Sequence, residues 1–371
     1  MRKILFLTAI LGLFASCSSD SDSPASSGDN YDRVALLTNW ADNIIIPRFE
    51  DYQSKVVLLN NDVATFTASP SQDNLENLRT SWLNSYKSYQ YVNMFNIGKA
   101  DDINFTDCTN IYPLNTQGVQ ENIAAGNVNL QLVSQYSKQG FPALDYMLNG
   151  LATSDSDILY FYTTDASALN YKEYLVALTT KLKSDADAIV NDWNGSYRAT
   201  FIASSGNSVS SSLNRMVNNF VKYFEKDIRA GKVGIPAGVY SDGATLPDKV
   251  EAYYKNDISK ILLEESVKGS QDFFNGKHFN SATEGKSLKS YLDFLNTVRN
   301  GQNLSAIINN QFTLINQANA NLSASFSSQV STGNAQMLIS FDNLQQNVIY
   351  FKLDMMQALN ITVDYVDADG D

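Results

Sequence analysis

The residues that could do chemistry lie at a break in a helical region. Gly140 and Pro142 stand two residues apart, and the carboxylate of Asp145 follows three residues later. Proline inside a helix removes a backbone hydrogen bond and clashes with the preceding turn, at a cost of roughly 3 kcal/mol. The sequence therefore predicts a broken or kinked helix here, with Asp145 in the first turn of the restarted helix. Such a break exposes unpaired backbone groups to a ligand.

Two interpretations of Asp145 remain open. The exposed amides and the dipole of a first helical turn favour an anion, so Asp145 can act simply as a cap of its own helix. Alternatively, its carboxylate faces the space between helices as part of a ligand site.

The single histidine argues against a zinc peptidase. Such an enzyme usually needs two histidines one helical turn apart and a general base, whereas this chain has only His278. Its Gly, Asn and Lys neighbours favour a loop position over a metal ligand. Hard cations stay open, because oxygen ligands alone can hold them.

The C-terminal aspartates alternate as they do at the start of a calcium loop, at Asp364, Asp367, Asp369 and Asp371. The stretch lacks the glutamate that such a loop requires at its twelfth position. We interpret it as a solvated, acidic end.

Composition excludes one class of function. The formal net charge is -12, so the chain would repel the phosphates of nucleic acid. The sequence also has no glycine-rich phosphate loop, nucleophile elbow or Cys-x-x-Cys pair. We therefore expect neither a nucleic-acid partner nor an enzyme.

The first residues have the layout of a bacterial lipoprotein signal. Arg2 and Lys3 precede an apolar run from Ile4 to Phe14, and small residues lead to Cys17. The run is too short to span a bilayer. Cleavage after residue 16 would leave Cys17 lipidated at the new N-terminus and, by loss of two positive charges, change the net charge from -12 to -14. The alternative is an ordinary cleaved signal with an incidental cysteine.

The composition of residues 17–30 predicts a flexible tether, because small polar residues cannot form a buried core. Several acyl chains hold a protein on a membrane stably. We therefore expect an outer-membrane lipoprotein, on the periplasmic face or the cell surface. Only Cys108 then remains as a free thiol, so an internal disulfide is excluded.

The elements that must position Asp145 are helices. Apolar residues recur at steps of three and four, which places them on one face of each helix. Such stripes must cover each other, which favours bundles. We also expect a helix start at Ser69, with Pro70 in the first turn and Gln72 in a capping box. Representative stripes are Phe49, Tyr52, Val56, Leu59, Val63 and Phe66; Leu75, Leu78, Trp82, Tyr86 and Tyr89; and Leu213, Val217, Phe220, Phe224 and Ile228.

The Gly/Ser-rich piece from Asn194 to Ser212 separates two helical sets. The predicted fold is all-α, with two similar up-down, four-helix-like bundles packed side by side. The predicted organisation is a signal peptide at 1–16, the lipidated cysteine and tether at 17–30, a first bundle at 31–195 and a second bundle at 196–371.

The segment from Gly140 to Asp145 resembles the Gly-x-His-x-x-Glu motif of the imelysin family. Gly140 matches the glycine, Pro142 stands in the histidine position and Asp145 in the glutamate position. Proline has no nitrogen lone pair for a metal, and aspartate is one methylene shorter than glutamate, so any metal site at the motif is altered or lost. Other stretches that resemble the family occur in the family's order, at 45–49, 82, 96–98, 111–113, 231–236, 265–266, 273–276 and 359–371.

The resemblance implies an exported two-bundle protein associated with iron acquisition. It implies a ligand site at the bundle interface comprising Gly140, Pro142 and Asp145, with Trp82 and Tyr86 as wall residues. It also implies iron as the cofactor, Asp145 as the metal ligand, and iron-uptake transport components as partners. Two alternatives are an interaction or adhesion lipoprotein that has lost the metal site and, less favoured, a metallopeptidase.

Overall fold

The computed structural model describes residues 29–126 and 128–366. The predicted signal peptide, Cys17 and most of the tether lie outside these residues. Tyr31–Asp371 forms one compact unit by its contacts. Over the described residues the only strands are the short antiparallel pair β1 (Val298–Arg299) and β2 (Gln302–Asn303), and helices form nearly all other regular structure. The all-α prediction is therefore confirmed.

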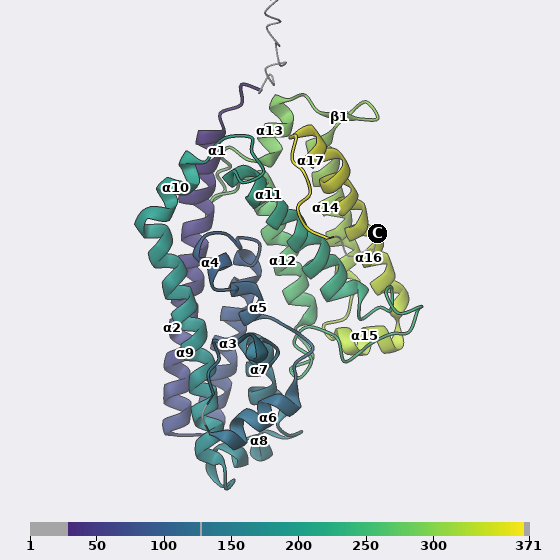
Figure 1. The fold of residues 1–371 in the computed structure, drawn as a ribbon. Helices are drawn as coiled ribbons and strands as arrows, with labels where there is room; N and C mark the ends of the chain where they lie inside the picture. Colours follow the sequence, from purple (N-terminus) through teal and green to yellow (C-terminus); the bar gives the residue numbers. More distant parts are fainter. Residues whose placement is uncertain (1–28, 127, 367–371) are drawn as a thin grey trace, which may run out of the picture. The chain divides into compact units, whose positions relative to one another are not determined.

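Three long helices build the first bundle: α2 (Ile46–Ala68), α3 (Gln72–Val92) and α9 (Ala168–Asp192). Helix α2 packs against both α3 and α9 (Figure 1). The fourth position is taken by the short helix α7 (Gly140–Asp145), which contacts α3 and α9. The predicted motif therefore lies where this bundle lacks a long fourth helix.

The second bundle is a ring of four helices. Helix α11 (Ser212–Lys222) continues as a π-helical segment, Tyr223–Gly234, which packs against α12 (Ser259–Asn275) and α16 (Asn334–Ile349). Helix α14 (Leu304–Ala320) closes the ring between α12 and α16. The bundles meet where α3 packs against α12.

Shorter elements connect and cover the bundles. No described helix is long and apolar enough to cross a membrane. The α-helices are α1 (Arg33–Trp40), α4 (Lys99–Asp102), α5 (Phe105–Thr109), α6 (Thr116–Ala125), α8 (Asp155–Thr163), α10 (Arg198–Ala203), α13 (Leu288–Phe294), α15 (Phe326–Thr332) and α17 (Met356–Ala358). The π-helical segments are Ala41–Ile45, Tyr146–Gly150, Trp193–Tyr197 and Tyr350–Met355, and a 3-10 helix spans Val133–Lys138.

The predicted apolar stripes form the core. All six stripe residues of α2, from Phe49 to Phe66, are at most 1% exposed, and burying each such side chain contributes about 1.5–3 kcal/mol. Side chains from both bundles belong to one continuous hydrophobic cluster. The boundary after residue 195 stays a prediction.

Two local predictions need correction. Helix α2 extends to Ala68, so Ser69 ends that helix, and Ser71 caps α3 by accepting a hydrogen bond from the Asn74 amide at 3.2 Å. The segment from Asn194 is partly helical, because buried Phe201 packs against Trp193 with ring centroids 5.2 Å apart and holds α10 in place.

Candidate functional site between the bundles

The backbone requires glycine at position 140. Gly140 has a φ of +74°, and a Cβ there would lie 2.1 Å from the carbonyl oxygen of Thr109. Gln139 is extended, and α7 begins at Gly140. The predicted break is confirmed, and a close approach to the end of α5 explains it at least as well as the proline.

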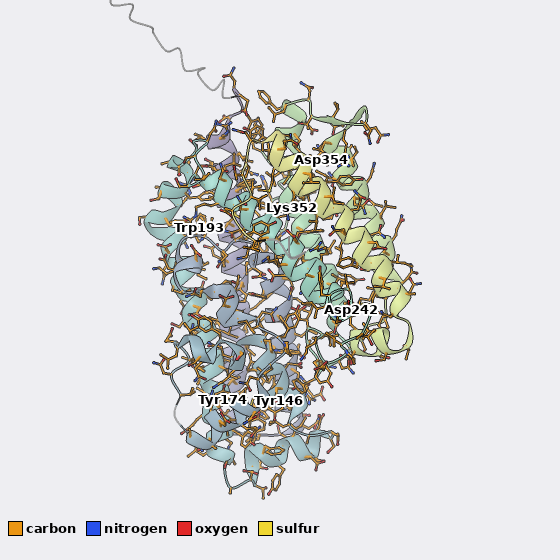
Figure 2. The ribbon with its side chains drawn as sticks, turned by 45° about the vertical axis from the view of Figure 1, so that its right-hand side comes forward. Tyr146, Tyr174, Trp193, Asp242, Lys352 and Asp354 are labelled. Atoms are coloured by element: carbon orange, nitrogen blue, oxygen red, sulfur yellow. The ribbon has the colours of Figure 1, made fainter. Side chains whose placement is uncertain are left out.

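Asp145 is the last residue of α7, so the prediction that it lies in a first helical turn is wrong. Helix α7 has no side-chain cap, and its chain continues into the π-helical segment that starts at Tyr146. Figure 2 labels Tyr146 in the lower part of the view. The break and the aspartate therefore lie at opposite ends of one short helix. This excludes the interpretation of Asp145 as the cap of its own helix.

The Asp145 carboxylate joins the first bundle by hydrogen bonds to the loop that contains Tyr254 and Lys255. One oxygen accepts the backbone N–H of Tyr254 at 2.8 Å, and the other accepts that of Lys255 at 2.9 Å. The side-chain amide of Asn149 donates a third hydrogen bond at 3.1 Å. Asp145 is 1% exposed, and this burial raises its pKa to about 7 although the three hydrogen bonds favour the ionised form.

Trp82 and Tyr86 lie beside the motif, and both are fully buried. The indole N–H of Trp82 donates to the carbonyl oxygen of Phe141 at 3.3 Å. The Tyr86 ring stacks on the Phe141 ring with centroids 4.4 Å apart and an interplanar angle of 5°. The two residues thus support α7 from α3 as part of the core, and their role as walls of a ligand site stays a prediction.

Pro142 and Asp145 line a hollow of 260 Å³, which we call the Asp145 hollow. Its opposite wall comes from the loop that contains Tyr254. The lining residues are Tyr112, Pro113, Leu114, Thr116, Pro142, Asp145, Asp248, Lys249, Val250, Ala252, Tyr253 and Tyr254.

A second hollow of 140 Å³, which we call the Asp227 hollow, shares Tyr112 with the first. It lies between α3, the segment 106–112 and the helical segment 219–232. The lining residues are Tyr89, Asn93, Asn96, Thr106, Asp107, Asn110, Ile111, Tyr112, Asn219, Lys222, Tyr223, Asp227 and Lys232.

A buried polar cluster adjoins the Asp227 hollow. Lys232 and Glu251 form an ion pair whose side chains are 3% and 2% exposed. Gln90 of α3 accepts a hydrogen bond from Lys232 at 2.9 Å and donates one to Glu251 at 3.2 Å. Asn110 also donates to Glu251, at 2.8 Å. The cluster joins both bundles and satisfies the two charges that would otherwise be costly to bury.

Two oxygen-bearing groups of the Asp227 hollow have no protein partner within the part of the chain that the structure describes. Among the described residues, Asp227 has no hydrogen bond or ion pair, and the side-chain carbonyl of Asn96 is buried without a donor. Asp227 is exposed to solvent, and the protein around it raises its pKa, although Lys232 and Lys222 oppose the shift. Buried polar groups are normally satisfied, so a buried carbonyl beside an accessible carboxylate suits a ligand that donates hydrogen bonds.

Sequence reasoning missed Asp227, Gln90 and Glu251 as functional candidates. One signal was present: Phe220, Phe224 and Ile228 advance by four along an apolar stripe, and the next step is Lys232. A lysine on such a stripe predicts a buried partner. The partner itself could not be found, because nothing local relates Lys232 to Glu251.

The motif residues Pro142 and Asp145 line one hollow, and the only histidine lines another. His278 lies in a loop, as predicted, and lines a third hollow with α2 and α12. Within residues 29–126 and 128–366, no group of three or more His, Cys, Asp and Glu side chains is arranged to hold a metal ion. The assignment of Asp145 as a metal ligand stays a prediction, and both of its oxygens already accept N–H groups.

These features define an all-helical, two-bundle protein with polar hollows where the bundles meet. The imelysin family model matches residues 45–349. The chain therefore belongs to the imelysin family, which also bears a peptidase name.

Individual relatives support this assignment. The chain is 23% identical over 268 residues to iron-regulated protein A of Synechococcus elongatus, covering 68% of each chain. The crystal structure of a protein described as a putative iron-regulated protein A precursor from Parabacteroides distasonis superposes with a TM-score of 0.72 at 16% identity, covering 90% of this chain and 97% of that one. An imelysin-like protein from Psychrobacter arcticum gives 0.70 at 17% identity with the same coverage. At these identities the two structures show a shared fold.

Proposed function

We propose that this protein is a lipid-anchored envelope protein that works in iron acquisition by binding a polar, iron-bearing small molecule in the Asp227 hollow. The observation that carries the proposal is the buried side-chain carbonyl of Asn96, which has no donor among the described residues, beside the exposed carboxylate of Asp227 at the junction of the bundles. The iron association comes from the family and from a relative named as an iron-regulated protein.

The lining of the hollow supports a polar, chelated cargo. Asp107 and Asp227 balance Lys222 and Lys232 in formal charge. Tyrosine hydroxyls and asparagine amides supply the remaining polar groups, so the hollow offers both donors and acceptors. The organic part of an iron complex presents such groups, and carboxylate oxygens suit hard metal ions.

Calorimetric titration of the full chain with ferric citrate, a ferric hydroxamate and haem tests the binding proposal. Asp227→Asn should weaken binding of the recognised complex about tenfold, the equivalent of 1.4 kcal/mol. The matched control is Asp342→Asn, which changes an exposed aspartate on α16. Equal affinity of wild type and Asp227→Asn would move the site elsewhere, and no binding of any iron complex would overturn the proposal.

The membrane anchor is a separate part of the proposal and rests on the signal before Cys17. Metabolic labelling with a fatty-acid analogue should mark the wild type and not Cys17→Ala. Labelling of both proteins, or of neither, would contradict lipidation at this cysteine.

The altered motif favours a second candidate, an interaction or adhesion lipoprotein. Pro142 replaces the expected histidine, and the Asp145 oxygens are used to hold the loop at Tyr254. This candidate predicts native protein that contains no iron by elemental analysis and captures a specific envelope partner. A residual peptidase would instead show chelator-sensitive cleavage of casein.

A further inference from the structure

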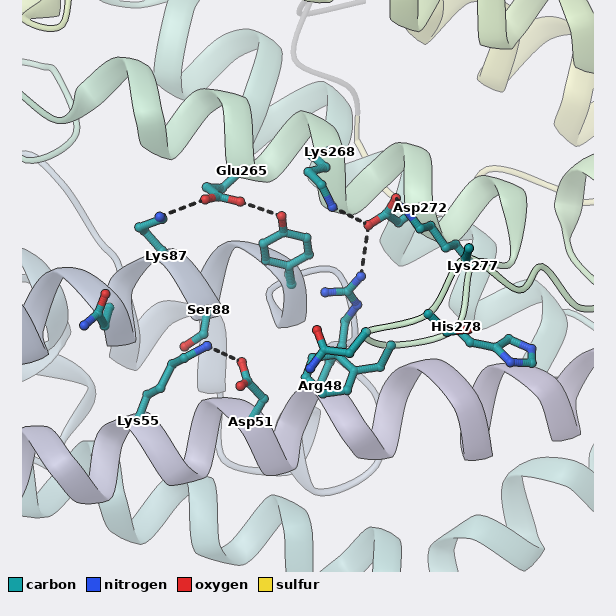
Figure 3. A pocket seen from close by; sticks show the side chains of 16 residues that line it. Arg48, Asp51, Lys55, Lys87, Ser88, Glu265, Lys268, Asp272, Lys277 and His278 are labelled. Atoms are coloured by element: carbon teal, nitrogen blue, oxygen red, sulfur yellow. Dashed lines mark hydrogen bonds and ion pairs between the residues drawn. The ribbon is translucent and has the colours of Figure 1, made fainter.

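A third hollow, of 570 Å³, is lined by charged side chains, which Figure 3 shows from close by. We call it the Arg48 hollow. Helices α2, α3 and α12 form its walls, and the loop 277–282 closes one side. The lining residues are Arg48, Asp51, Lys55, Asn84, Lys87, Ser88, Tyr91, Glu265, Lys268, Asp272, Lys277, His278, Phe279, Asn280, Ser281 and Ala282.

Positive charge accumulates in the Arg48 hollow. Its lining contains five cations, the arginine and four lysines, against three carboxylates, those of Asp51, Glu265 and Asp272. The difference is an excess of two positive charges, in a chain whose formal net charge is -12. A concave wall with an excess of one sign of charge attracts ions of the opposite sign.

A single carboxylate is shared by three of these cations. Asp272 lies 3.1 Å from Arg48, 2.9 Å from Lys268 and 3.7 Å from Lys277. One negative charge cannot neutralise three positive ones. Burial lowers the pKa of Arg48, although Asp272 and Asp51 oppose the shift.

An aromatic ring holds two of the cations in position. The Arg48 guanidinium lies 4.2 Å from the centroid of the Tyr91 ring, and the Lys268 ammonium lies 5.4 Å from it. The Tyr91 hydroxyl donates to Glu265, which pairs with Lys87 at 3.1 Å (Figure 3). Stacking of this kind orders cations without neutralising them, so their positive charge remains for a ligand.

The Arg48 hollow is separate from the Asp227 hollow. Along α3, residues 84, 87, 88 and 91 share one helical face, whereas 89 and 93 lie on the opposite face. The two hollows therefore open from opposite sides of the same helix. Binding in one can be tested without touching the other.

We infer that the Arg48 hollow binds a small oxyanion with two or more negative charges, of the phosphate or polycarboxylate type. The planar Arg48 fork and the flexible lysines are the groups that proteins use for such oxygens. Lys268, at 56% side-chain exposure, and Lys87, at 31%, are accessible to an incoming anion.

Calorimetric titration of the full chain with pyrophosphate, citrate and acetate tests this inference. Both multiply charged anions should bind at least tenfold more tightly than acetate, and added salt should weaken them. No measurable binding of either, or equal binding of acetate, would overturn the inference. Failure here leaves the proposal for the Asp227 hollow intact, because Asp227→Asn and Lys268→Gln change the two hollows separately and pyrophosphate, unlike citrate, is a probe of the Arg48 hollow alone.

Substitution of a lining lysine tests whether the anion binds in the Arg48 hollow. Lys268→Gln should weaken pyrophosphate binding about tenfold, whereas Lys289→Gln should not. Lys289 is the matched control, because it pairs with Asp293 in the same i,i+4 geometry, at 3.0 Å, on a different helix. If Lys268 only stabilises α12, Lys268→Gln lowers the melting temperature of the protein. Pyrophosphate then does not raise the melting temperature of the wild type, and the inference fails.

A second experiment distinguishes whether the anion is a lipid headgroup or a dissolved phosphate compound. Cosedimentation with vesicles of phosphatidic acid, and not of phosphatidylcholine, would assign a lipid headgroup. Binding of soluble pyrophosphate without cosedimentation would assign a dissolved phosphate compound. Either result supports the site, and the absence of both contradicts it.

Discussion

The carboxylate of Asp145 accepts a hydrogen bond from the backbone amide of Tyr254, a residue 109 positions further along the chain. This bond and its neighbour from Lys255 hold the loop of the second bundle against the end of α7. A motif position expected to bind a metal therefore has a structural role in this protein.

Replacing Asp145 by alanine should destabilise the protein by about 1–3 kcal/mol, because it leaves partly buried amides without an acceptor. Urea unfolding near neutral pH measures the change. Asp342→Ala is the control, since that side chain is exposed on α16. A loss below about 0.5 kcal/mol for Asp145→Ala, which is within the range of ordinary surface changes, would mean that the loop is held by other contacts.

The same carboxyl group should make stability depend on pH. Burial raises the pKa of Asp145 to about 7 in the folded protein from an ordinary value of 3.8. The folded protein then binds this proton more tightly than the unfolded chain, so the group stabilises fully below about pH 4 and loses its contribution as the pH rises through about 7.

Unfolding free energies of wild type and Asp145→Asn, measured from about pH 5 to about pH 8, check this sign. The stability of the wild type relative to the variant should fall with rising pH, with a slope of at most about 1.4 kcal/mol per pH unit. A constant or rising difference would show that the three hydrogen bonds to Asp145 outweigh its desolvation.

Gly140→Ala should be among the most damaging small substitutions in the chain. The new methyl group would lie 2.1 Å from the Thr109 carbonyl oxygen, and the positive φ adds strain. Gly301→Ala is the matched control, because Gly301 has a similar φ of +76° with no atom within 4 Å of a Cβ.

The control should lose only about 1 kcal/mol, the cost of the left-handed backbone. The difference in melting temperature between the two variants measures the close approach of α7 to α5. Equal melting temperatures would contradict this close approach.

The buried pair between Lys232 and Glu251 should show strong coupling. Lys232→Met leaves the Glu251 charge without its partner and should cost about 3–5 kcal/mol. The double variant Lys232→Met, Glu251→Gln should recover part of that loss. A double-mutant cycle by chemical unfolding gives the coupling, and additive losses would mean that the two charges act independently.

Much of the fold could be predicted from local patterns. The stripe from Phe49 to Phe66 places α2, and the irregular Gly140 correctly marks a helix break. The predicted start of α3 lies two residues early, because Ser69 and Ser71 are both good caps and only the length of α2 decides between them.

The candidate site was predictable only in part. The sequence identified Asp145 but not its partners, because the amide of Tyr254 has no signature in the local sequence. Trp82 and Tyr86 were placed near the motif correctly, yet the sequence did not show that both contact Phe141 of α7. Asp227 was missed because it lies exposed beside an apolar stripe, as most acidic residues on a solvated helix face do, and nothing local relates it to Asn96.

The continuous core predicts how the protein behaves after proteolytic cleavage of its backbone. Residues 206–210 are exposed between α10 and α11, so a protease could nick the backbone there. The resulting fragments would still share the hydrophobic cluster and the contact between α3 and α12. They should migrate together in gel filtration and separate only in denaturant, whereas either fragment produced alone would have a bare apolar flank and a tendency to aggregate.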